Sequence, residues 1–129
     1  MVSRGLADTS LFIARESGRT LATERLPDSL AASVITIGEL RTGVLAASDT
    51  ATRDRRLATL LAAQRIGPLP IDEPTAEAWA RLRVSLRDLR KKMPVNDSWI
   101  AASALALALP VVTQDDAYSV VPGLEVIPV

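Results

Sequence analysis

The chain of 129 residues contains no cysteine and no histidine. Without cysteine there is no disulfide framework, no thiolate metal site and no cysteine nucleophile. Without histidine there is no Ser-His-Asp arrangement and no imidazole ligand for a transition metal. Any bound metal must therefore be held by oxygen ligands, which favours Mg²⁺, Mn²⁺ or Ca²⁺.

Aromatic side chains and net charge are also scarce. One Phe, one Tyr and two Trp disfavour a protein that reads single-stranded RNA by stacking bases on aromatic rings, and 15 basic residues balance 15 acidic ones. The sequence has no signal-peptide pattern and no run near the roughly 20 apolar residues that a membrane span requires. We therefore expect a cytoplasmic protein with no membrane contact and one domain, residues 1–129.

Short apolar segments alternate with longer helical patterns along the chain. The patterns predict strands at residues 5–7, 33–37, 69–72, 111–113 and 124–127. They predict helices that follow Asp8 and that cover residues 38–47, 50–66, 74–92 and 94–109, with a short extra helix within 19–29. This alternation predicts the α/β class, as three α/β/α layers around a mostly parallel central sheet.

Four acidic residues are expected at one edge of that sheet. Asp8, Glu39 and Asp115 follow predicted strands, and Asp97 begins the apolar helix over residues 94–109. Ligands of parallel sheets bind beyond the carboxyl ends of the strands. Carboxylates crowded there would raise one another's pKa unless a cation were bound, and bound Mg²⁺ or Mn²⁺ could activate water against a phosphodiester.

Each acidic residue also has a simpler structural interpretation. Asp8 and Asp97 could each cap a helix, and Asp115 could occupy a turn. Glu39 is harder to explain in this way, because an unpaired charge among apolar residues is costly to bury.

Basic residues gather in the second half of the predicted helix over residues 74–92. Arg83, Arg87, Arg90 and Lys91 share roughly one side of that helix. They could contact RNA phosphates, or they could form a solvated face whose cations favour the helix C-terminus.

Four segments together resemble the signature blocks of PIN domains: LADTSLFI, ITIGEL, NDSWIAASALALALP and VVTQDDAY. The four segments span almost the whole chain. Among PIN domains, the sequence most resembles the toxins of bacterial VapBC toxin–antitoxin pairs. The resemblance implies an endoribonuclease toxin that depends on Mg²⁺ or Mn²⁺ and acts on an RNA substrate. It also implies a homodimer and a cognate antitoxin whose C-terminal segment covers the cleft.

The resemblance also assigns roles to single residues. It places four acidic residues in the catalytic positions: Asp8, Glu39, Asp97 and Asp115. Asp8, Asp97 and Asp115 are the implied metal ligands, and Thr113 matches a supporting hydroxyl position. Asp115 is chosen over Asp116 because it stands two residues after Thr113, although Asp116 could share or replace its role.

Two other classes of protein fit parts of the pattern. A non-catalytic module with the same fold could bind RNA or protein partners, and the loss of an acidic position would favour it, but all four are present. A phosphatase or a response-regulator receiver also has aspartates at strand ends, but the sequence lacks DxDxT and an early pair of adjacent acids. The motifs GxxxxGK[ST] and GxGxxG are absent too, which disfavours a nucleotide binder.

Overall fold

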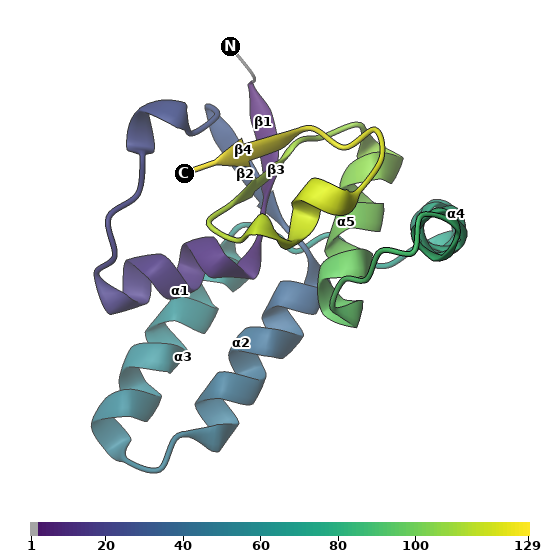
Figure 1. Ribbon diagram of the computed structural model, residues 1–129. Helices are drawn as coiled ribbons and strands as arrows, with labels where there is room; N and C mark the ends of the chain where they lie inside the picture. Colours follow the sequence, from purple (N-terminus) through teal and green to yellow (C-terminus); the bar gives the residue numbers. More distant parts are fainter. Residues whose placement is uncertain (1–2) are drawn as a thin grey trace.

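The computed structural model describes residues 3–129 and contains a parallel four-stranded sheet surrounded by helices (Figure 1). The strands are β1 (Arg4–Ala7), β2 (Ser29–Ala32), β3 (Val111–Thr113) and β4 (Val126–Pro128). The helices are α1 (Thr9–Ser17), α2 (Val34–Ala46), α3 (Thr50–Arg65), α4 (Glu73–Asp88) and α5 (Val95–Leu107), with short 3-10 helices η1 (Thr23–Arg25) and η2 (Asp116–Val120). The strand order is β2-β1-β3-β4 and every pairing is parallel, which confirms the predicted α/β class.

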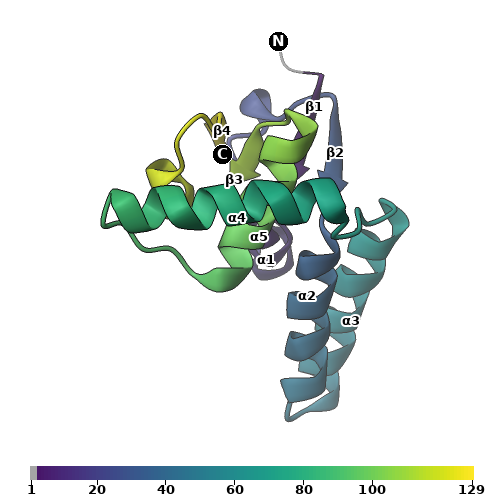
Figure 2. The same cartoon turned by 90° about the vertical axis from the view of Figure 1, so that its right-hand side faces the viewer.

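Both faces of the sheet are covered, because successive side chains of a strand point to opposite faces. Leu6 and Val111 belong to the main core, where they pack with residues of α4, α5 and η2. Ala7 and Val112 pack on the other face with Leu11 of α1. Figure 2 shows α4 lying across the outside of α5. The three-layer arrangement is as predicted.

Helices α2 and α3 form a hairpin that extends away from the sheet, and we call it the helical arm (Figure 1). The arm has its own small cluster of buried residues: Leu40, Val44, Leu60 and Ala63. Its two helices are also joined by the Arg56 guanidinium, which donates a hydrogen bond to the Gly43 carbonyl at 2.7 Å.

The prediction of a strand at residues 33–37 was wrong. The strand is β2, which ends at Ala32, and α2 already begins at Val34. Ser33 is completely buried and caps α2, since its hydroxyl accepts a hydrogen bond from the Ile35 N–H at 3.0 Å. The β-branched residues that suggested a strand form the first turn of this helix. Glu39 consequently lies in the second turn of α2 and not at a strand-to-helix junction.

Four other predicted boundaries also differ from the structure. The predicted strand at 69–72 is only a single parallel bridge between Ser33 and Leu69. The helix expected within 19–29 is reduced to η1. The last strand is β4, shifted by one to two residues from 124–127. A helix was predicted over residues 74–92, but α4 ends at Asp88, and the chain then has a positive φ of 55° at Arg90.

Among the described residues, none of the helices has the length and apolar character that crossing a membrane would need.

Candidate metal centre

Asp8 lies directly after β1 and is the most buried of the four predicted site residues, with 2% of its surface exposed. Its Oδ1 accepts a hydrogen bond from the Tyr118 hydroxyl at 2.7 Å, and its Oδ2 accepts one from the Thr113 hydroxyl at 2.9 Å. The Ser10 N–H is a longer donor to Oδ2, at 3.4 Å. Asp8 therefore does begin α1, but its strongest contacts are to side chains more than a hundred positions away and not to the helix it caps.

Asp97 faces Asp8 from the first turn of α5 and is partly buried. The Tyr118 hydroxyl lies 3.4 Å from Asp97 Oδ1, so one hydroxyl is within hydrogen-bonding distance of both carboxylates. The N-cap of α5 is Pro94, which has no capping side chain. Asp97 is thus not explained as a helix cap.

The surroundings of Asp97 raise its pKa from 3.8 to about 6. Burial is the main cause, and the negative charges of Asp8, Asp115 and Glu39 add to it, while the hydrogen bond from Tyr118 acts in the opposite direction. The charges of the other three predicted acidic residues therefore all act on Asp97. Burial and the negative charges of Asp8, Asp97 and Glu39 also raise the pKa of Tyr118, so its hydroxyl stays protonated and available as a donor.

Asp115 stands at the end of β3 as the N-cap of η2 and is exposed to solvent. Its Oδ1 accepts a hydrogen bond from the Ala117 N–H at 3.1 Å, and its own N–H donates to the Thr113 hydroxyl at 2.8 Å. Thr113 therefore links Asp115 to Asp8, as expected of a supporting hydroxyl. Asp116 is exposed in η2 and is not among the charges that act on Asp97, which favours Asp115 as the site residue.

Glu39 reaches the same region from α2. Its Oε1 accepts a hydrogen bond from the Thr9 hydroxyl at 2.7 Å, and that hydroxyl lies 2.8 Å from the hydroxyl of the buried Thr36. The side chain is partly buried and hydrogen-bonded, so the charge next to the core is not left unpaired.

The Tyr118 hydroxyl links Asp8 to Asp97, and the Thr113 hydroxyl links Asp8 to the backbone of Asp115, whereas Glu39 is hydrogen-bonded to Thr9. Within residues 3–129, no three acidic side chains are drawn together so closely that they already enclose an ion. Asp115 is exposed and Asp97 and Glu39 are partly buried, so these three side chains have room to turn toward a cation beside Asp8. Oxygen-only donors and mutual repulsion fit Mg²⁺ or Mn²⁺, because such an ion would relieve the repulsion that raises the pKa of Asp97.

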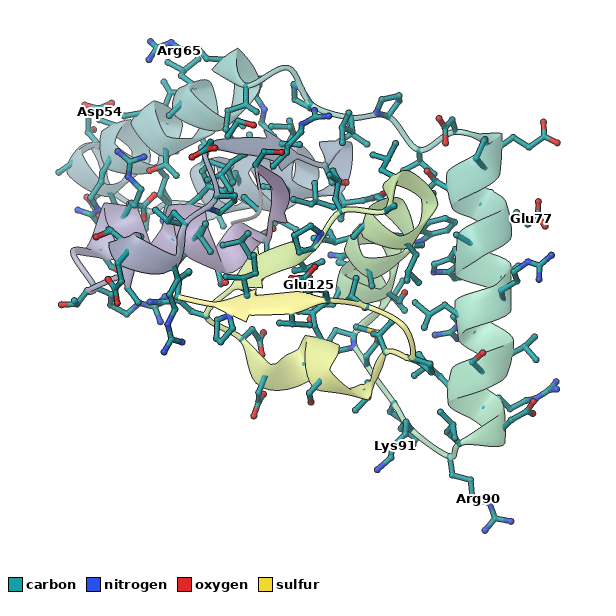
Figure 3. The ribbon with its side chains drawn as sticks, turned by 90° about the horizontal axis from the view of Figure 1, so that it is seen from above. Asp54, Arg65, Glu77, Arg90, Lys91 and Glu125 are labelled. Carbon is teal, nitrogen blue, oxygen red and sulfur yellow. The ribbon has the colours of Figure 1, made fainter. Side chains whose placement is uncertain are left out.

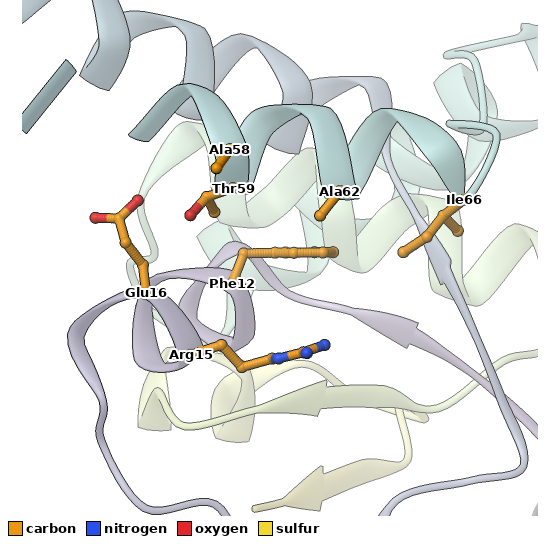
Figure 4. A pocket seen from close by; sticks show the side chains of 7 residues that line it. All are labelled: Phe12, Arg15, Glu16, Ala58, Thr59, Ala62 and Ile66. Atoms are coloured by element: carbon orange, nitrogen blue, oxygen red, sulfur yellow. The ribbon is translucent and has the colours of Figure 1, made fainter. Parts of the chain in front are cut away.

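Two surface hollows flank the carboxylates. One has a volume of about 570 Å³ and is lined by Ser10, Ile13, Arg19, Gln114, Asp115 and Asp116. The other, of about 260 Å³, is lined by Ile13, Glu16, Glu39, Leu40, Gly43 and Arg56. A further hollow of about 410 Å³ lies between α1 and α3 (Figure 4), and none of the four site residues lines it.

The predicted basic face on α4 is not continuous. The Arg83 guanidinium stacks over the Trp79 ring at 5.4 Å, and the Arg87 side chain pairs with Asp88. Arg90 and Lys91 lie beyond the end of α4 (Figure 3). The basic residues that line the hollows beside the carboxylates are instead Arg19 and Arg56, from two other parts of the chain.

Three residues that contact the predicted carboxylates were not predicted from the sequence, namely Tyr118, Thr9 and Ser10. The two hydroxyl residues follow Asp8 directly, and Tyr118 comes three positions after Asp115, so proximity in the sequence was the available signal. Proximity alone does not show that the Tyr118 hydroxyl contacts Asp8 and Asp97, because this contact depends on how η2 packs into the core.

Comparisons with known proteins agree with this architecture. A family model described as PIN domain matches residues 6–124. Ribonuclease VapC5 of Mycobacterium tuberculosis is 49% identical over 119 residues, which cover 92% of this chain and 88% of that protein. Ribonuclease VapC4 of the same species is 49% identical over an alignment of 131 positions, which covers 98% of this chain and 97% of that protein.

A solved structure agrees as well. It is described as a member of the VapBC family of toxin-antitoxin systems, VapBC-5, from Mycobacterium tuberculosis, and it superposes with a TM-score of 0.91 at 44% identity. The superposition covers 98% of this chain and 99% of that chain.

Proposed function

Because this chain belongs to the PIN-domain family, we propose that it is the ribonuclease toxin of a toxin–antitoxin pair and a metal-dependent endoribonuclease. The observation that carries the proposal is the pair formed by Asp8 and Asp97. Asp8 is buried with both oxygens hydrogen-bonded, and Asp97 has its pKa raised to about 6 by burial and by three other acidic side chains. Such an arrangement is unfavourable without a cation and typical of a metal site.

The proposed metal ligands are Asp8, Asp97 and Asp115, with Asp8 and Asp97 holding the principal ion. When bound, Mg²⁺ or Mn²⁺ supplies the Lewis acidity that activates water and stabilises the charge developing on the phosphate. Asp8 contributes a carboxylate fixed in place by Thr113 and Tyr118. Hydrolysis by this route leaves 5′-phosphate and 3′-hydroxyl ends.

Glu39 is the proposed residue that completes the site or orients the attacking water. Its Oε1 is occupied by the hydrogen bond from Thr9, which leaves Oε2 free to accept a hydrogen bond from that water. Thr9 belongs to α1, so its hydrogen bond ties the Glu39 carboxylate of α2 to the helix that follows Asp8.

Arg19 and Arg56 are the proposed contacts for phosphates of the RNA on either side of the cut. Each lines one of the two hollows that flank the carboxylates. A guanidinium there would offset the negative charge that the acidic site presents to an RNA backbone.

We further propose a cognate antitoxin, a homodimer and a cytoplasmic site of action. The antitoxin is supported by the similar solved structure, which is described as a toxin-antitoxin system. A basic side chain of such a partner would lower the repulsion among the four carboxylates in the same way as a cation, which gives inhibition a direct electrostatic cause.

Cleavage of total cellular RNA by the purified chain tests this function. We expect cuts with Mg²⁺ or Mn²⁺, none with EDTA, and none with Asp97→Asn, while Asp54→Asn on the exposed side of α3 serves as the matched control and cuts like the wild type. Sequencing the fragment ends would identify the substrate and the chemistry of the ends. Full activity of both Asp8→Asn and Asp97→Asn would contradict the site assignment, and no cleavage with any ion would favour a non-catalytic module that binds RNA or protein.

A further inference from the structure

Tyr118 is the one tyrosine of the chain, and its side chain is completely buried. The ring belongs to the main core, where it packs with apolar residues of β1, β3 and α5. Packing of the ring therefore fixes the position of its hydroxyl group, which lies next to the carboxylates of Asp8 and Asp97. This placement differs from that of Thr113 and Thr9, whose hydroxyls sit at the ends of short side chains.

The tyrosine hydroxyl meets two acidic residues from separate parts of the fold. It lies 2.7 Å from Oδ1 of Asp8, at the end of β1, and 3.4 Å from Oδ1 of Asp97, in α5. A hydroxyl carries one proton, so it donates to Asp8, the nearer acceptor, and leaves Asp97 without an equally strong donor. Asp8 is thereby held on both oxygens, whereas Asp97 keeps freedom to move.

We propose that Tyr118 is a positioning residue for the metal centre, whose hydroxyl fixes the Asp8 carboxylate at the distance from Asp97 at which the two residues bind one divalent ion. The inference rests on the proposed metal-dependent function. Tyr118 does not bind the ion in this arrangement. It acts through Asp8, by removing rotational freedom that Asp8 would otherwise lose only when the ion binds.

Binding of Mn²⁺ to the full-length protein, measured by electron paramagnetic resonance without RNA, tests the proposal directly. Tyr118→Phe keeps the ring and removes only the hydroxyl, and we expect its dissociation constant for Mn²⁺ to rise about tenfold or more. Ser103→Ala is the matched control. Ser103 is a buried hydroxyl on the same helix as Asp97, but it donates only to the Trp99 carbonyl, at 3.0 Å, and its removal should leave Mn²⁺ binding unchanged.

A second measurement keeps the tyrosine in place and therefore does not depend on how well Tyr118→Phe folds. Protein labelled with ¹³C at tyrosine Cζ gives one resonance, because there is one tyrosine, and the Cζ shift reports the hydrogen bonding of its hydroxyl. We expect this resonance to move when Mg²⁺ saturates the site, and to stay in place on adding Mg²⁺ to Asp8→Asn.

The outcomes separate this proposal from the proposed function. If the wild type binds Mn²⁺ but Tyr118→Phe binds it within twofold as tightly, or if the Cζ resonance does not respond to Mg²⁺, the role of Tyr118 is refuted and the metal-dependent function stands. If the wild type binds no Mn²⁺ at all, both are refuted.

Discussion

Replacing Asp97 by Asn should stabilise the metal-free protein while it abolishes cleavage. The pKa of Asp97 rises from 3.8 to about 6 on folding, because of burial and of the charges of Asp8, Asp115 and Glu39. Between these pH values the folded state holds the proton more tightly than the unfolded state, so stability falls as pH rises through this window. Each pKa unit corresponds to about 1.4 kcal/mol, which sets a limit of roughly 3 kcal/mol on the cost of the ionised group.

Solvent screening lowers this limit because Asp97 is only partly buried. We expect Asp97→Asn to raise the free energy of unfolding by about 1–2 kcal/mol at pH 7.5, where the wild-type carboxylate is ionised. At pH 4 the carboxylate of the folded wild type is protonated, so the gain should largely disappear.

Urea unfolding in EDTA, at one protein concentration and at both pH values, measures the effect. Asp54→Asn on α3 is the control and should change stability by less than about 0.5 kcal/mol at either pH. Figure 3 shows Asp54 on the helical arm, at the opposite end of the molecule from α4. With saturating Mg²⁺ the order should reverse, because only the wild type gains stability from the ion. Equal stability of wild type and Asp97→Asn at pH 7.5, or an equal difference at both pH values, would refute the electrostatic reasoning.

Two further substitutions test the supports of the site. Thr113→Val removes the hydroxyl that donates to Asp8 and accepts from the Asp115 N–H. We expect the free energy of unfolding to fall by about 1–3 kcal/mol and the cleavage rate to fall by about 10- to 100-fold. Thr113→Ser keeps the hydroxyl and should be close to wild type in both assays. Thr113→Val with wild-type cleavage would show that Asp8 needs no such support. Gly5→Ala adds a methyl group that would lie 2.7 Å from Cγ2 of Val112 on the neighbouring strand, and thermal unfolding should show a loss of about 1–3 kcal/mol. An unchanged Tm would mean that β1 and β3 can separate without cost.

The residues of the candidate site could be proposed from the sequence because they stand beside elements with clear patterns. Asp115 follows a short β-branched strand, and Asp97 opens a helix rich in alanine and leucine, so both could be placed from the sequence. Glu39 was chosen as a candidate although the strand assigned before it was wrong. Its position one turn into α2 still leads to the same edge of the sheet, since α2 begins where β2 ends.

The missing parts depend on tertiary packing, which local pattern does not encode. The β-branched residues after Ser33 favour a strand locally, but Thr36 packs in the interior as part of a helix, and packing outweighs propensity there. Tyr118 could not be placed because its contact with Asp8 joins residues 110 positions apart. Likewise, the local pattern around Arg90 favours a helix, but α4 ends at Asp88 and Arg90 has a positive φ.

The separate core of the helical arm has a consequence for the native ensemble. Leu40 and Val44 pack with residues of α3 and with Phe12 of α1, and within residues 3–129 no residue of the sheet belongs to this cluster, so we expect the arm to open while the sheet stays folded. Amide hydrogens of α2 and α3 should then exchange with solvent at a lower opening free energy than those of β1 and β3. Glu39 is part of α2, so opening of the arm takes it away from Asp8, Asp97 and Asp115. Only the folded molecules whose arm is closed then have all four acidic residues at the candidate site.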